Sequence, residues 1–257
     1  MQRYFIEFSY DGANYHGWQI QPNGTTVQEV MQCAISTLLR QEIQLVGAGR
    51  TDAGVHASKM VAHFDLELPL DEMADNFSPV QLVYKLNRLL PQDIAVSSVY
   101  PVDSELHARF SAVKRTYHYF IHTRKMPFRR SYSWEVHYDL NFQLMNEAAA
   151  CLLSVDDFAS FCKAGADVKT TLCNVCTAHW VEDEPGCWHF EIAANRFLRN
   201  MVRAVVGTLV EVGRGRMTIE QFREVVRKRQ RTAAGESMPA HALFLVDVEY
   251  PKRVESL

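Results

Sequence analysis

The sequence predicts an α+β fold made of two ferredoxin-like (RRM-like) halves. The first 103 residues contain signals for a strand, a helix, two strands, a helix and a strand, in that order, and the second half repeats this order. The chain has 257 residues, of which 47% are apolar, enough for a sizeable core. We therefore expect two domains, 1–103 and 104–257, with antiparallel sheets that are joined or adjacent and a cleft between them.

Each element of the first half has a local signal. Alternating strands and apolar residues at helical spacing set the element types, and Thr26 to Glu29 have the form of a capping box. Ser78-Pro79 starts a second helix, whose expected apolar side is Val80, Val83, Leu86, Leu89 and Leu90. The expected elements are a strand at 3–10, a helix at 27–41, strands on either side of a glycine-rich segment (43–46 and 59–66), a helix from 79 to 90 and a strand at 93–99.

The second half is expected to contain a strand at 111–122, a helix at 141–154, strands at 172–181 and 187–194, helices at 197–212 and 219–229, and a last strand at 243–250. The helix at 197–212 would carry a basic stripe opposite its apolar face. This stripe consists of Arg196, Arg199, Asn200, Arg203 and Gly207. A basic face on a surface helix is also common without any ligand, so the stripe alone does not decide its role.

The glycine-rich segment 47–57 connects two predicted strands. Its three glycines and its alanines allow tight turns and leave space around Arg50, Asp52 and His56. Small neighbours would expose the Asp52 carboxylate to a large ligand. An ordinary hairpin, in which Asp52 makes a local turn hydrogen bond, is the simpler interpretation of the segment by itself.

The charge is unevenly distributed. The net charge is −3, but residues 104–130 carry +6 and residues 196–231 carry +7, while the rest carries −16. Within the first block, Arg115, Tyr117 and Tyr119 fall on one face of a predicted strand. Cations beside aromatic rings suit a surface that binds phosphates and stacks bases, although tyrosines in strands are often simply core residues. Two basic blocks indicate a polyanionic partner, most plausibly a nucleic acid.

No apolar run reaches the length of a membrane span, and the N-terminal residues lack a signal-peptide pattern, so we expect a cytoplasmic protein with no membrane partner. The six cysteines are then expected to be reduced thiols. Cys173 and Cys176 form a single C-x-x-C, which is weak evidence for zinc without a second such pair.

Several sequence motifs occur in order along nearly the whole chain. They are Tyr10-Asp11-Gly12 with Gly17-Trp18-Gln19, the segment from Gly49 to Ala57, His107-Ala108-Arg109-Phe110, Arg115-Thr116-Tyr117, and Met201-Val202-Arg203 with Val206-Gly207. Together these motifs resemble those of the TruA family, the tRNA pseudouridine synthase A enzymes.

The resemblance implies an isomerase that converts uridine to pseudouridine at positions 38 to 40 in the anticodon stem-loop of tRNAs, as a homodimer, with no cofactor and no metal, in an active-site cleft between the halves. It implies that Asp52 is the nucleophile, that Tyr117 stacks on the target uracil, and that Arg203 is the ion-pair partner of Asp52. Arg50 matches an arginine that holds the extruded nucleotide. Leu243 matches a leucine at the active site, although Ala242 stands where the family usually has glycine. The other expected RNA-binding residues are His56, Arg109, Arg115, Arg196 and Arg199.

The chemistry of such an isomerase agrees with these residues. The carboxylate has to be ionised in a site that the incoming base dries, and a nearby arginine favours the anion. Addition of Asp52 to C6, attack at C1′ and elimination to a glycal are all compatible with the sequence. Two other classes remain as alternatives: a non-catalytic RNA-binding module, which would not need Asp52, and a metal-dependent nuclease, which would need clustered carboxylates.

Overall fold

The computed structural model describes residues 1–73, 78–166 and 168–251. The protein is a mixed α+β structure whose strands pair mostly antiparallel. It divides into two compact units, which are described separately. Unit 1 consists of Met1–Val113 together with the chain after Phe244, and unit 2 is Lys114–Phe244.

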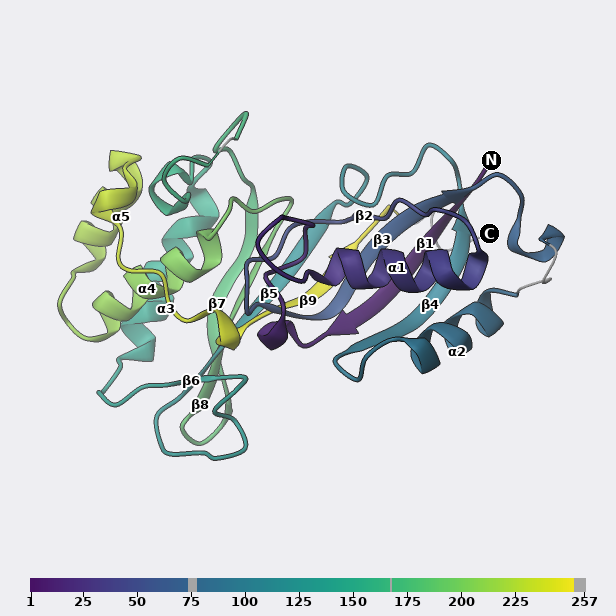
Figure 1. Ribbon diagram of the computed structural model, residues 1–257. Helices are drawn as coiled ribbons and strands as arrows, with labels where there is room; N and C mark the ends of the chain where they lie inside the picture. Colours follow the sequence, from purple (N-terminus) through teal and green to yellow (C-terminus); the bar gives the residue numbers. More distant parts are fainter. Residues whose placement is uncertain (74–77, 167, 252–257) are drawn as a thin grey trace. The chain divides into compact units, whose positions relative to one another are not determined.

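Unit 1 contains, in order, β1 (Gln2–Tyr10), α1 (Val27–Leu39), β2 (Val46–Gly47), β3 (His56–Leu66), α2 (Pro79–Leu89) and β4 (Ile94–Val102). Strand β1 lies between β4 and β3 and is antiparallel to both, and β2 pairs with β3. The two helices lie side by side along these strands (Figure 1). Ile6, Phe8 and Phe64 lie on one face of the sheet and are almost completely buried, so burial of this face fixes the register.

Helix boundaries in unit 1 follow the predicted caps. The Thr26 hydroxyl accepts a hydrogen bond from the Glu29 N–H at the start of α1, and a complete capping box starts α2 at Ser78. Helix α1 ends two residues earlier than predicted, because Arg40 adopts a left-handed conformation with φ of 56°. The predicted apolar side of α2 was partly wrong. Leu82 and Leu86 are buried, whereas Val80 is 78% exposed and Leu89 is 48% exposed.

Unit 2 contains β5 (Lys114–His122), β6 (Trp134–Glu135), α3 (Phe142–Ala150), β7 (Val175–Glu184), β8 (Cys187–Ala194), α4 (Met201–Gly213) and α5 (Ile219–Lys228). Strand β8 lies between β5 and β7 and is antiparallel to both. Strand β9 (Leu243–Glu249) begins in unit 2 and ends in unit 1. Tyr119, Phe190 and Trp180 point to the face of the sheet that packs on α3, since the Trp180 ring contacts Phe142 of α3 and Phe190 lies beside Trp180 and Tyr119.

The helix predicted at 197–212 begins only at Met201. Asn200 has a φ of 66°, and the Met201 N–H binds the Leu198 carbonyl, so residues 195–200 form a loop. The basic stripe that the helical spacing predicted is therefore wrong as a helix face. Arg203 and Gly207 belong to α4, whereas Arg196 and Arg199 belong to the loop before it. Within the described residues, no helix has the length and apolarity needed to cross a bilayer.

Candidate functional site

The segment that carries Asp52 is a loop, residues 48–55, between β2 and β3. Backbone hydrogen bonds hold both of its ends: the Ala48 N–H binds the Val61 carbonyl at 2.7 Å, and the Val55 N–H binds the Asp52 carbonyl at 3.1 Å. Gly54 has a φ of 76°, a conformation that favours glycine. Asp52 thus sits in a closed turn. Its side chain is half-buried, and the neighbouring Arg50 is exposed.

A second segment, residues 10–18, supports the loop from the side. Thr51 is at the centre of this contact: its hydroxyl lies 2.8 Å from the Tyr10 hydroxyl, and its carbonyl accepts a bond from the Trp18 N–H at 3.2 Å. Gly12 and Gly17 allow the approach. A Cβ at Gly12 would collide with the Val55 carbonyl, and one at Gly17 would lie 2.5 Å from the Thr51 carbonyl oxygen. These contacts explain why the motifs of residues 10–12 and 17–19 accompany the Asp52 motif.

His56 lies behind the loop, with only 1% of its side chain exposed. Its Nδ1 is 2.9 Å from the Asp11 carboxylate and 3.0 Å from the Gly12 backbone nitrogen. One ring nitrogen cannot donate to the first and accept from the second at once, so the tautomer selects one bond. Either bond ties β3 to the turn after β1. The geometry gives His56 a supporting position rather than a solvent-facing one.

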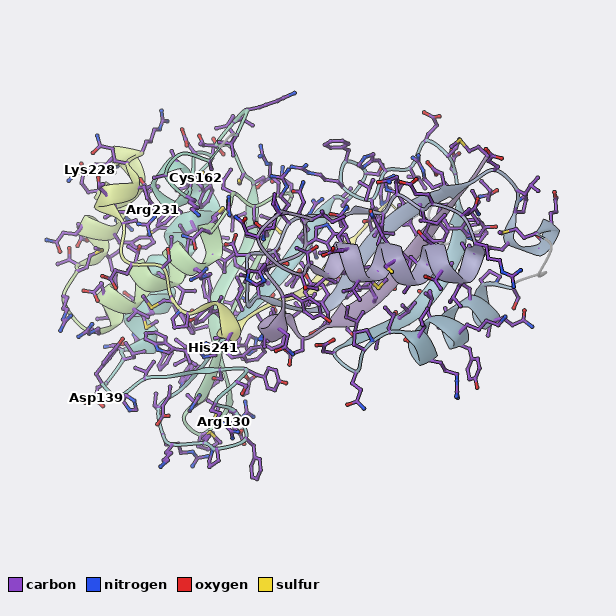
Figure 2. All side chains as sticks on the ribbon, viewed as in Figure 1. Arg130, Asp139, Cys162, Lys228, Arg231 and His241 are labelled. Carbon is purple, nitrogen blue, oxygen red and sulfur yellow. The ribbon has the colours of Figure 1, made fainter. Side chains whose placement is uncertain are left out.

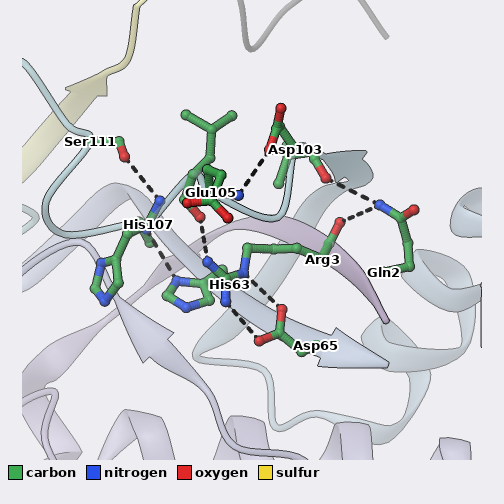
Figure 3. A network of polar contacts seen from close by, with 11 residues as sticks. Gln2, Arg3, His63, Asp65, Asp103, Glu105, His107 and Ser111 are labelled. Carbon is green, nitrogen blue, oxygen red and sulfur yellow. Dashed lines mark hydrogen bonds and ion pairs between the residues drawn. The ribbon is translucent and has the colours of Figure 1, made fainter. Parts of the chain in front are cut away.

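Arg109 lies on a separate loop of unit 1, residues 106–111, and is exposed together with Phe110. The loop is fastened to the sheet by a polar network (Figure 3). The Arg3 guanidinium donates to the Leu106 carbonyl at 2.8 Å, and the Ala108 N–H donates to Nδ1 of the buried His63 at 3.1 Å. Arg3 in turn forms a two-bond ion pair with Asp65 at 2.7 and 2.8 Å. The network presents Arg109 on a fixed backbone.

His63 can accept this bond only while its Nδ1 is unprotonated. Desolvation by burial, followed by the nearby Arg3 charge, lowers the pKa of His63 to about 4. Desolvation also lowers the pKa of His107, whose ring packs edge-on against His63 with centroids 4.7 Å apart. Both imidazoles are therefore neutral near pH 7, and the loop stays attached.

In unit 2, Tyr117 and Arg115 lie on β5 and are each only 8% exposed. The Tyr117 ring packs edge-on against Phe197 with centroids 5.0 Å apart. The Arg115 guanidinium donates to the Asn195 carbonyl at 2.7 Å, which ties β5 to the loop before α4. Leu243, at the start of β9, is also buried. These three side chains are parts of the packed structure of unit 2, and Tyr117 retains a small exposed area.

Arg203 is on the first turn of α4, beside the segment 235–238. Its Nε donates to the Met238 carbonyl at 2.6 Å, and the Met238 N–H returns a bond to the Arg203 carbonyl at 3.2 Å. Gly207 permits this docking, because a Cβ there would collide with the Glu236 carbonyl. Arg231, labelled in Figure 2, also holds this segment by donating to the Gly235 carbonyl at 2.9 Å. The Arg203 guanidinium is thereby fixed in direction and half-buried.

The remaining candidates lie in the loop before α4. Arg199 is exposed, and its carbonyl accepts a bond from the Lys163 N–H at 3.0 Å, whereas Arg196 is half-buried. Arg199 is thus the more accessible cation of this loop.

The cysteines do not form a metal site with one another in the described part of the chain. All six cysteines are free thiols, and Cys173 and Cys176 differ in exposure, one buried and the other exposed. Over residues 1–73, 78–166 and 168–251, the group whose donor atoms could surround one metal ion is His118, His189 and Glu191, on β5 and β8. It contains no cysteine.

The sequence of the chain matches a known protein family. The sequence model described as tRNA pseudouridine synthase matches residues 7–111 and 148–251. The chain is 55% identical to tRNA pseudouridine synthase A of Bacteroides thetaiotaomicron, over 100% of this chain and 93% of that protein. The chain belongs to the tRNA pseudouridine synthase family. It is 52% identical to the Bacteroides fragilis enzyme and 40% identical to that of Bacillus subtilis, covering 99% and 94% of this chain and 98% and 96% of those proteins.

Membership of this isomerase family confirms the resemblance found in the motifs. Arg3 and His63, which hold the 106–111 loop of the synthase by hydrogen bonds, were not predicted from the sequence. His63 had a signal, since it lies among buried positions of an alternating strand, but Arg3 is an ordinary strand residue before the fold is known. The contact between residues 235–238 and α4 could not be predicted from neighbouring residues either. Arg203 and Met238, which bond to each other, are 35 residues apart in the sequence.

Packing of the 10–18 segment against the Asp52 loop predicts the effect of Gly12→Ala in this synthase. The added methyl group should push Val55 away and destabilise the fold by about 1 to 3 kcal/mol. Turnover should fall more than tRNA binding, because the displaced residues are next to Asp52, which the motif resemblance predicts to be the nucleophile. Urea unfolding and single-turnover kinetics measure the two effects.

Gly215→Ala is the matched control. Gly215 has a φ of 69°, but none of the described residues lies within 4 Å of the Cβ position. This variant should lose about 1 to 2 kcal/mol through backbone strain alone, with wild-type turnover. Wild-type turnover in Gly12→Ala as well would contradict the proposed support of the loop.

The lowered pKa of His63 predicts a pH-dependent stability. In the unfolded chain the His63 imidazole has a pKa of 6.5, whereas in the folded protein its pKa is about 4. Stability from this group is therefore complete above pH 6.5 and is lost as the pH falls. Between about pH 7.5 and about pH 5 the loss should be about 2 kcal/mol.

His63→Asn tests this, since the amide oxygen can accept the Ala108 N–H without titrating. Urea unfolding at both pH values should show a smaller loss in this variant than in the wild type. His137→Asn, which replaces an imidazole 79% exposed, should keep the wild-type loss. The idea is wrong if His63→Asn and the wild type show the same pH dependence.

Proposed function

We propose that this chain converts uridine to pseudouridine at positions 38, 39 and 40 in the anticodon stem-loop of tRNAs, with Asp52 as the nucleophile. Membership of the family supports pseudouridine formation in tRNA. The observation that carries the assignment of Asp52 is the rigid 48–55 loop, which holds one half-buried carboxylate on a backbone fixed by bonds to β3 and to residues 15–18.

The reaction breaks the N1–C1′ bond and forms a C5–C1′ bond. C5 gives up its proton, and N1 of the original base gains one, so no oxidant or reductant is needed. The detached base must stay in place while it turns. A positioned carboxylate can act as a nucleophile, or as the base that accepts the C5 proton, and both roles require it ionised.

Tyr117 and Arg203 are proposed to act on the same uridine as Asp52, Tyr117 by stacking on the uracil and Arg203 as the ion-pair partner of Asp52. Flipping a uridine out of a stem costs a few kcal/mol, which stacking on an aromatic ring offsets in part. The edge contact with Phe197 leaves the Tyr117 ring in a fixed orientation. The Met238 carbonyl likewise fixes the Arg203 guanidinium.

RNA contact is proposed for the accessible cations Arg50, Arg109 and Arg199, which are all exposed, and for the half-buried Arg196. Arg50 would hold the extruded nucleotide, and the others would contact phosphates. Since His56 and Arg115 are buried, we assign them the positioning of the 11–12 turn and of the loop at Asn195. Leu243 would form part of the wall beside the base.

The two units are proposed to be two ferredoxin-like halves with the active-site cleft between them. Supporting this, unit 1 has the order β1-α1-β2-β3-α2-β4, with β1 between β4 and β3. A homodimer, the absence of any cofactor from the reaction and a cytoplasmic location also belong to the proposal, by resemblance to the family.

Position is tested with tRNA transcripts that carry uridine at only one of positions 38, 39 and 40. Each transcript should gain one pseudouridine at its single uridine, and a transcript with cytidine at all three positions should gain none. Chemical mapping of pseudouridine gives the position. Modification of the cytidine transcript elsewhere in the tRNA would contradict the proposed site.

The two arginines near the start of α4 are predicted to behave differently. Arg199→Ala should weaken tRNA binding and leave the chemical rate at saturating tRNA nearly unchanged, because a phosphate contact stabilises the ground and transition states about equally. Arg203→Ala removes the partner proposed for Asp52 and should lower the chemical rate itself. Single-turnover kinetics at saturating tRNA separate the two. An equal loss of chemical rate in both variants would remove the role given to Arg203.

A further inference from the structure

A compact group of metal-binding side chains lies on one face of the sheet in unit 2. His118 on β5 pairs directly with Glu191 on β8, and Glu191 pairs directly with His179 on β7. His189 lies two residues before Glu191 and therefore points to the same face. Three of the ten histidines of the chain thus share a sheet face with Glu191.

This face is the opposite one from that of Tyr117. Tyr117 and Tyr119 alternate with His118 and are buried on the side where α3 packs, as Trp180 and Phe190 are. His118 and Glu191 keep 23% and 31% of their side chains exposed. An ion on this face would be separate from the residues proposed to act on uridine.

The distances suit a single ion. His118 Nε2 is 3.3 Å from a Glu191 carboxylate oxygen, and one donor atom each from His118, His189 and Glu191 lie within 4.8 Å of one another. Tetrahedral zinc with bonds of about 2.0 to 2.1 Å needs donors roughly 3.4 Å apart. The His118 and Glu191 donors are already at that separation, and the His189 ring has to move by no more than about 1.5 Å.

One of the imidazoles is also oriented by a carboxylate. His189 Nδ1 lies 2.8 Å from an Asp183 oxygen, so Nε2 is the nitrogen left for an ion. A ligating histidine bound to a carboxylate through its other nitrogen is common in metal sites. The rings of His118 and His189 are stacked with centroids 4.4 Å apart, which brings the two imidazoles to the same side of Glu191.

We propose that His118, His189 and Glu191 bind one divalent transition-metal ion of the zinc type, with His179 as the fourth ligand and Asp183 orienting His189. Two or three imidazoles with one carboxylate match zinc, cobalt or nickel, whereas magnesium and calcium prefer oxygen ligands. The ion links β5 to β8 and so holds the strand that carries Tyr117 in register. It takes no part in the isomerisation.

Cobalt serves as the spectroscopic probe. EDTA-stripped, full-length protein is titrated with Co²⁺, and we expect one equivalent to bind with the visible absorption of a tetrahedral nitrogen and oxygen site. Glu191→Gln and His189→Gln should weaken binding at least about 100-fold, and Asp183→Asn by about 10- to 100-fold. The control His137→Gln, at the exposed histidine beside Glu135, should bind like the wild type.

Zinc should also raise the melting temperature of the wild type and leave that of His189→Gln unchanged. If a variant does not fold, anomalous scattering from zinc in wild-type crystals locates the ion directly. An ion between His118, His189 and Glu191 supports the proposal. Absence of stoichiometric binding, thiolate charge-transfer absorption from cysteine ligands, or wild-type affinity in Glu191→Gln and His189→Gln would overturn it.

Discussion

The close approach of two backbone segments in unit 1 is the constraint on which the candidate site depends. Residues 10–18 lie against residues 51–55, and glycine at 12 and 17 is required because side chains there would collide with the carbonyls of Val55 and Thr51. The Thr51 hydroxyl and carbonyl are both satisfied in this contact. Asp52 is thus carried by a loop that contacts on both sides hold in place, as the catalytic role proposed for Asp52 requires.

The same principle recurs around the arginines of unit 2. Gly207 lets residues 235–238 lie on α4, and the Met238 carbonyl then fixes the Arg203 guanidinium. In both units a glycine permits a close backbone contact next to a charged residue of the candidate site, and in unit 2 this contact fixes the direction of the Arg203 guanidinium. Exposed cations such as Arg109 are held differently, through the neutral His63 and the Arg3 pair beneath their loop.

Local signals were sufficient for much of the fold. Caps at Thr26 and Ser78 and the hairpin that ends β7 gave correct elements, because these depend on neighbouring residues. The start of α4 could not be predicted, since the left-handed Asn200 interrupts a sequence with good helical spacing. The buried side of α2 was also predicted partly wrongly, because it depends on tertiary packing. Both Val80 and Leu82 are apolar, and only the tertiary packing decides which of them is buried.

The sequence predicts which residues form the candidate site, but it does not predict the contacts that hold them in place. Motif residues such as Asp52 and Arg203 stand out in the sequence, whereas their fixation depends on long-range contacts with Tyr10, Trp18 and Met238. Burial of His56 and Arg115 likewise follows from tertiary structure. The sequence motifs contain both kinds of residue. The structure shows that Arg50 faces solvent, whereas His56 and Arg115 are buried and position neighbouring loops.

The central claim is that the Asp52 carboxylate performs the chemistry. The most direct measurement is release of tritium from C5 of labelled uridine in tRNA, in EDTA, by the wild type and by Asp52→Asn. The amide keeps nearly the same shape, so the variant should bind tRNA like the wild type and release no tritium, while the wild type releases it and leaves the RNA chain intact. Tritium release by Asp52→Asn within about tenfold of the wild-type rate would contradict the claim.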